Sequence, residues 1–170
     1  DRLWLVKDGK ASPYDGDLAD YKALVLAADR PDETRTHAVA RAEIAAGATN
    51  EGPDGPLYPG TCRGREVDPE GAAWRLDMAK AVAREPELEW VDELAGSQRA
   101  APELFGDLVL VRKDVPASYH LAATLDDAAQ GISVVTRGMD LFAASHVHRL
   151  LQALLGLPVP LWHHHALLVE

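Results

Sequence analysis

The chain has 170 residues and a formal net charge of −10, from 27 acidic and 17 basic side chains. This length suits one ordinary domain, and the acidic balance argues against a broad phosphate-binding surface, because Lys and Arg supply most nucleic-acid affinity. No apolar run approaches the roughly eighteen residues of a membrane span, and residues 1–10 lack a signal-peptide core, so we expect a soluble cytoplasmic protein. The single Cys62 cannot form an internal disulfide, which agrees with a reducing compartment.

The first part of the chain is expected to hold turns, two short helices and a loop. Residues 1–16 carry turn signals at both ends of a short apolar stretch. Helical spacing of apolar residues predicts a helix over 17–28 and a second over 38–47, which Gly47 would close. Residues 48–71 are rich in Gly and Pro, and this density predicts an irregular loop.

The middle of the chain gives weaker signals. Residues 72–79 are ambiguous between strand and helix, although the local alanines favour a helix. Residues 85–95 suit a turn or a new helix, with an apolar row at Leu88, Val91 and Leu94. Residues 96–102 read as a linker.

Three β-type runs followed by a helix organise the rest of the chain. The runs are Asp107 to Arg112, Tyr119 to Leu125 and Ile132 to Thr136, and their mostly apolar character predicts a sheet covered on both faces. A helix is expected over Met139 to Leu155, with Gly156 as its stop, and a short strand over the final LWHHHALLVE.

Polar residues follow these predicted strands. In open α/β sheets, ligands bind beyond the carboxyl ends of the strands. We therefore expect one group of side chains to gather there: Tyr119, Asp126, Asp127, Arg137 and Asp140.

Histidines are frequent near the end of the chain. His146 and His148 lie two apart on the predicted helix and cannot share one face. Of the next three histidines, only His163 and His165 could converge on an extended strand.

Several sequence motifs in this chain occur together in a known family. YHLA, LDDAAQGIS, RGMDL and AASHVHRLLQALLGLPVP resemble the second half of the catalytic core of glutamyl-tRNA synthetases, and most closely the short glutamyl-Q tRNA(Asp) synthetases. The resemblance implies an α/β fold with a partial class I nucleotide-binding, Rossmann-like core. The core would comprise 1–36 and 103–170, interrupted by a small loop-rich insertion over 37–102.

The resemblance also implies roles for individual residues. Tyr119 and Arg137 correspond to the side chains that hold glutamate, and Asp140 to an acidic residue near the nucleotide ribose. A guanidinium binds a carboxylate through two parallel hydrogen bonds, which suits this role. The alternatives are that Tyr119 is a core aromatic of a strand, that Arg137 pairs with Asp126 or Asp127, and that Asp140 caps the long helix.

A zinc knuckle is part of the same resemblance. Relatives supply three cysteines and a tyrosine from CxC and YPGTC, and YPGTC is present here from Tyr58 to Cys62. His37 and Val39 occupy the positions of the two earlier cysteines. Zinc prefers four ligands, and His37, Tyr58 and Cys62 leave the set one short, so we expect weak zinc binding or none.

Two phosphate-binding signatures of class I synthetases do not occur in the printed sequence. No HIGH-like word precedes residue 17, and no lysine follows Lys113 to form a KMSKS-like loop. In the family, ATP and Mg²⁺ activate glutamate, which is transferred to tRNA, and in the short relatives to the queuosine of tRNA(Asp). We expect no adenylate formation by this chain alone, unless a homodimer or a second chain completes it. The alternative is a non-catalytic remnant that binds a small acidic ligand or a partner chain.

Overall fold

The computed structural model divides the chain into two units, residues 1–43 and 44–170. The residues that it describes are 3–7 and 10–14, through their backbone, and 47–48, 50–63, 72–112 and 115–167. In the first unit, β1 (Leu3–Lys7) pairs antiparallel with β2 (Lys10–Tyr14). The helix predicted over 17–28, and nearly all of the helix predicted over 38–47, lie outside the described residues.

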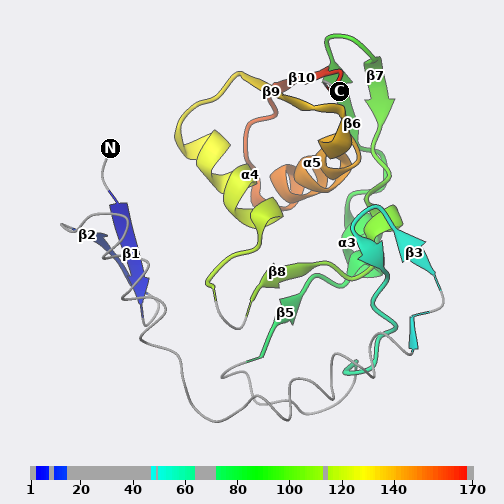
Figure 1. The fold of residues 1–170 in the computed structure, drawn as a ribbon, viewed down its shortest axis with the longest axis vertical. Helices are drawn as coiled ribbons and strands as arrows, with labels where there is room; N and C mark the ends of the chain where they lie inside the picture. The colour runs from blue at the N-terminus through cyan, green and yellow to red at the C-terminus, as the bar shows by residue number, and fades with distance from the viewer. Residues whose placement is uncertain are drawn as a thin grey trace. The chain divides into compact units, whose positions relative to one another are not determined.

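The second unit contains a four-stranded sheet, drawn at the top of Figure 1. Its order is β7 (Gly96–Arg99), β6 (Glu89–Asp92), β10 (Leu161–His165) and β9 (Val134–Gly138). Strand β10 is parallel to both β6 and β9, whereas β7 is antiparallel to β6. Parallel strands far apart in the sequence are typical of α/β folds.

Side chains alternate between the two faces of this sheet, as the pleat requires. On β6 and β10 the buried positions are Trp90, Asp92, Trp162 and His164. The opposite face leaves Val91 exposed, so the expectation of a sheet covered on both faces is not met within the described residues.

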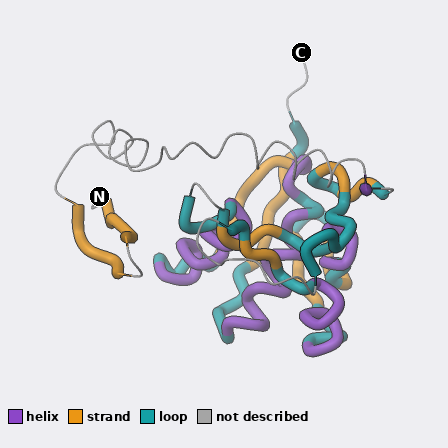
Figure 2. Tube along the Cα trace, turned by 90° about the horizontal axis from the view of Figure 1, so that it is seen from below, coloured by secondary structure: helices purple, strands orange, loops and turns teal. Residues whose placement is uncertain are grey.

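Helices cover the buried face (Figure 2). Helix α5 (Ala144–Leu155) contacts β6, α4 (Tyr119–Ala129) and α3 (Met78–Arg84). Two short 3₁₀ turns also occur: η1 (Pro102–Phe105) precedes strand β8 (Val109–Val111), and η2 (Met139–Leu141) precedes α5. The apolar core consists of Met78, Ala81, Phe105, Leu108, Val147, Leu150 and Leu151. Each fully buried large aliphatic side chain contributes roughly 1.5–3 kcal/mol.

Two small antiparallel pairs complete the described fold. Strand β5 (Trp74–Arg75) pairs with β8 (Val109–Val111), and β3 (Glu51–Gly52) pairs with β4 (Gly55–Pro56).

The prediction of a strand over Tyr119 to Leu125 is wrong, because this segment is the first part of α4. Ser118 caps the helix by accepting from the backbone N–H of Leu121, and the following alanines favour helix. Asp126 and Asp127 therefore lie in the last turns of a helix and do not end a strand.

Other boundaries were predicted more closely. The predicted strand over 132–136 is β9, the predicted helix over 139–155 is η2 followed by α5, and the final strand is β10. Gly156 ends α5 in the left-handed conformation, with φ 65°, as predicted. The ambiguous segment 72–79 contains β5 and then the start of α3, and 85–95 contains strand β6 instead of a helix.

The division into 1–36 with 103–170, and 37–102, stays a prediction. Strands β6 and β7 come from the second of these ranges, and they pair into the sheet that holds β9 and β10. Within the part of the chain that the structure describes, no helix is both long and apolar enough to cross a membrane.

Candidate substrate-binding site

Arg137 lies on β9, one residue before its carboxyl end, and faces α5. It pairs in register with His164 of β10 and is 9% exposed. Its Nη2 is 3.1 Å from Nδ1 of His148, while its Nε has no hydrogen-bond partner. None of the ion pairs among the described residues includes Arg137. The site therefore contains a buried guanidinium with an unused donor.

The surroundings of Arg137 explain its electrostatics. Burial lowers the pKa of this guanidinium, and the charge and hydrogen bond of Tyr119, with the charge of Asp127, oppose that effect only in part. Burial likewise raises the pKa of Asp127, with Arg137 opposing. An anion bound beside Arg137 would offset the cost of burying its charge.

Tyr119 is the first residue of α4 and is 53% exposed. Its ring centroid lies 5.8 Å from that of His148, and its phenol interacts with Arg137. The structure thus brings Tyr119 and Arg137 together, although Tyr119 comes from a helix N-terminus and not from a strand end. The alternative of a buried strand aromatic is wrong for Tyr119.

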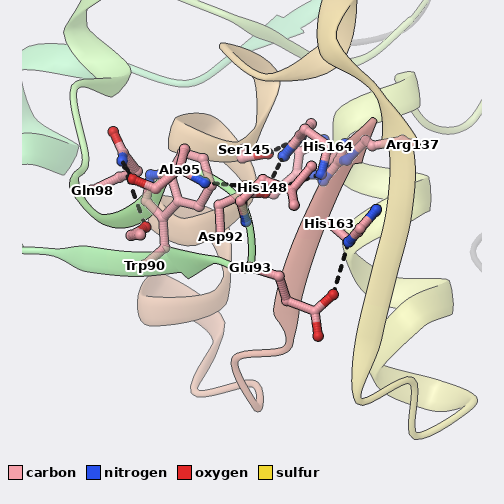
Figure 3. A network of polar contacts seen from close by, with 12 residues as sticks. Trp90, Asp92, Glu93, Ala95, Gln98, Arg137, Ser145, His148, His163 and His164 are labelled. Carbon is pink, nitrogen blue, oxygen red and sulfur yellow. Dashed lines mark hydrogen bonds and ion pairs between the residues drawn. The ribbon is translucent and has the colours of Figure 1, made fainter. Parts of the chain in front are cut away.

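A second polar network lies beside Arg137 and is completely buried (Figure 3). Oδ2 of Asp92 accepts from the backbone N–H and the Nδ1 of His164, at 3.0 and 2.8 Å. Nε2 of His164 is 3.1 Å from Oγ of Ser145. Burial alone would raise the pKa of Asp92, but hydrogen bonds from His164, Ala95 and Leu94 outweigh it, and the pKa is lowered.

This network has the composition of a hydrolytic triad but not its accessibility. A serine nucleophile must reach a substrate carbonyl, and Ser145 is 0% exposed. Asp92 comes from β6, His164 from β10 and Ser145 from α5, so the network joins three elements. We interpret it as a support for the part of the sheet that carries Arg137.

Asp140 follows β9 in the turn η2 and is exposed. A Cβ added at Gly138 would collide with Oδ1 of Asp140, so the carboxylate leans back over the glycine. The alternative that Asp140 caps α5 is wrong, because the N-cap is Ala143 and has no side-chain cap bond. The nucleotide role of Asp140 stays a prediction.

Two residues of the predicted zinc knuckle, Tyr58 and Cys62, are described by the structure. Oη of Tyr58 accepts from the backbone N–H of Cys62 at 2.7 Å, and the Arg75 guanidinium lies 4.2 Å from the Tyr58 ring centroid. A cation at this distance disfavours a second one. His37 lies outside the described residues. Across the described ranges, no three His, Cys, Asp or Glu side chains converge on a metal position, so zinc is unsupported.

Comparison with known proteins identifies the family. Residues 69–170 match the family model for the catalytic domain of class I tRNA synthetases (E and Q), which covers more than half of the chain. The chain belongs to this family. The expected class I α/β core is thereby confirmed.

Two curated relatives of this chain carry the same name. A glutamyl-Q tRNA(Asp) synthetase of Rhodobacter capsulatus is 45% identical over 140 residues, which are 74% of this chain and 50% of the relative. One of Symbiobacterium thermophilum is 36% identical over 144 residues, 80% of this chain and 42% of the relative. The chain thus spans about half the length, or less, of these relatives.

Solved structures show the same fold. The glutamate tRNA ligase of Elizabethkingia meningosepticum, crystallised with its amino acid, matches with a TM-score of 0.51 at 22% identity. The match covers 89% of this chain and 32% of that protein.

The sequence did not predict the contacts of His148. Its Nδ1 lies near Arg137 and its Nε2 lies 3.2 Å from Nδ1 of His120, which in turn lies near Asp54, and no local signal joins these separate segments. His164 could have been found, because alternation along β10 places it opposite to His163 and His165.

Proposed function

We propose that this chain carries the glutamate-binding part of a glutamyl-Q tRNA(Asp) synthetase-like ligase of the cytoplasm. The names of its curated relatives and its family support this proposal. The observation that carries it is the buried Arg137 guanidinium, which has a free Nε beside the exposed Tyr119.

The chemistry of Arg137 suits an amino-acid carboxylate. The Nε–H and a neighbouring Nη–H form a fork of two donors, one for each carboxylate oxygen. The exposed phenol of Tyr119, which interacts with Arg137, would orient the same ligand. A carboxylate bound there would also relieve the uncompensated charge that burial makes costly.

The remaining substrates belong to the same proposal. Asp140, exposed after the carboxyl end of β9, would accept from a ribose hydroxyl of ATP. ATP with Mg²⁺ would supply the activation of the glutamate carboxylate, and tRNA(Asp) would be the acceptor. Of these proposed substrate sites, the amino-acid site is the one that the described residues support most directly.

Calorimetric titration with L-glutamate tests the amino-acid site. Arg137→Lys keeps the charge but loses the fork, and Tyr119→Phe loses only the hydroxyl. A hydrogen bond to a charged group is worth about 1.5–3 kcal/mol, so each variant should bind roughly ten- to a hundredfold more weakly. Arg149→Lys is the matched control. Arg149 also lies on α5, but its Nε donates to the backbone carbonyl of Glu89 on β6. Absence of glutamate binding by the wild-type chain would refute the site.

Pyrophosphate exchange separates the ligase from a binding remnant. Glutamate-dependent exchange would establish activation. Glutamate binding without exchange would support the binding remnant, whereas a stable complex in gel filtration would indicate that a second chain or copy completes the site.

A further inference from the structure

Four side chains from four segments form a hydrogen-bonded row that ends at Arg137. Nη2 of Arg137 is 3.1 Å from Nδ1 of His148, and Nε2 of His148 is 3.2 Å from Nδ1 of His120. Nε2 of His120 is 2.9 Å from Oδ2 of Asp54. Arg137 lies on β9, His148 on α5, His120 on α4, and Asp54 between β3 and β4. The two histidines are buried, whereas the Asp54 side chain is 59% exposed.

The row has a single direction. A guanidinium only donates, so Nδ1 of His148 must be a bare acceptor, and its proton resides on Nε2. That Nε2–H points at Nδ1 of His120, which must accept in turn. The proton of His120 then resides on Nε2 and is donated to Asp54. Every link has one donor and one acceptor.

Any other protonation state breaks the row. A proton on Nδ1 of His148 would face the donating Nη2 of Arg137, and two donors cannot bond. A doubly protonated His148 would also place two buried cations in contact. Burial, with the charges of Arg137, His120 and His164, lowers the pKa of His148 to about 3, which agrees with a neutral ring.

We propose that His148 is a positioning residue that fixes the guanidinium of Arg137, and that Asp54, acting through His120, stabilises the same tautomer of His148 that Arg137 requires. The proposal rests on Arg137 as the glutamate-binding side chain. With Nη2 held by His148, the Nε edge of the guanidinium has one orientation toward the ligand. The exposed Asp54 of the β3–β4 turn is thereby coupled to the amino-acid site, although it does not touch Arg137.

Matched substitutions separate positioning from packing. In His148→Gln, Oε1 can accept from Arg137 and Nε2 can donate to His120, so the direction of the row is retained. His148→Met has a similar volume but no comparable acceptor. At the outer end, Asp54→Asn keeps an acceptor for His120, and Asp54→Ala removes it.

Glutamate titration of these variants measures the coupling. We expect His148→Met to bind at least about tenfold more weakly than the wild type, and His148→Gln within about threefold. Asp54→Ala should lose about two- to tenfold, with Asp54→Asn near the wild type. Equal affinity of the Met and Gln variants, or of the Ala and Asn variants, would overturn the proposal. If His148→Met does not fold, the exposed Asp54 pair still decides.

Nitrogen NMR of the ring atoms provides a readout that packing would not move. The wild type should show protonated Nε2 and bare Nδ1 on both His120 and His148, and Asp54→Ala should change the tautomer populations. A proton on Nδ1 of His148 would overturn the row. This measurement is independent of glutamate, so a chain that binds no glutamate refutes the proposed function while the spectra still test the row.

Discussion

Removal of the buried Asp92 carboxylate should cost far more stability than removal of the carboxylate next to it in the sequence. Asp92 accepts four hydrogen bonds, from Leu94 N, Ala95 N, His164 N and His164 Nδ1. Asp92→Ala leaves the two donors of His164 buried without a partner, and the part-buried N–H groups of Leu94 and Ala95 lose their acceptor. Each unsatisfied donor costs about 1–3 kcal/mol, and loss of one member of a buried pair typically costs about 3–5 kcal/mol in all.

We therefore expect Asp92→Ala to lower the free energy of unfolding by about 3–5 kcal/mol. Asp92→Asn keeps the shape and one acceptor but turns an NH₂ toward the two donors of His164, and about 2–4 kcal/mol should be lost. Either loss is a large part of the roughly 5–15 kcal/mol of a typical domain.

Urea unfolding, followed by circular dichroism, measures both variants. The matched control is Glu93→Gln, because Glu93 pairs with His163 as Asp92 pairs with His164, each at 2.8 Å. The control pair is exposed and should change stability by less than about 1 kcal/mol. Equal effects of Asp92→Asn and Glu93→Gln, at unchanged m values, would refute the reasoning.

Three further predictions follow from the same geometry. The pKa of His148 is about 3 in the folded chain and about 6.5 when unfolded, so the unfolded state binds more protons between these values and stability falls as the pH is lowered. From about pH 7 to pH 5, His148→Gln should lose about 2 kcal/mol less than the wild type in urea titrations, and parallel profiles would contradict this. Gly52→Ala should lower the free energy of unfolding by about 1–3 kcal/mol, because the new Cβ would meet the backbone carbonyl of Leu104; an unchanged urea midpoint would refute the contact. Ser118→Ala should lower the free energy of unfolding by about 1 kcal/mol, because α4 loses its N-cap. An unchanged midpoint temperature of thermal unfolding would exclude that role.

Strong local patterns predicted the end of the fold well. The apolar run before Arg137-Gly138 is a strand, and the apolar stripe closed by Gly156 is a helix, because each pattern matches one period over its whole length. The strand prediction for Tyr119 to Leu125 was wrong because its pattern does not select one period. Its apolar residues fit either period, and the Ser118 cap with the following alanines decided for helix.

The site was predictable in part. The family resemblance paired Tyr119 with Arg137, and the structure places them together, by way of a helix N-terminus that the sequence did not indicate. The row through His148 and His120 to Asp54 was beyond sequence reasoning. Its successive members are 11, 28 and 66 residues apart along the chain, and tertiary packing, such as that of α4 on α5 at His120 and His148, brings them into contact.

The position of β10 at the centre of the strand order determines when the sheet can form during translation. Strands β6 and β9 do not pair with each other, and each meets β10, which is translated after both. Until residue 165 has been made, β6 and β9 each have an unpaired edge in a nascent chain. The Asp92 carboxylate also lacks its hydrogen-bond donors on His164. Closure of the sheet is thus a late, non-local event, and a ribosome stalled within α5 would leave a chain prone to edge-to-edge aggregation.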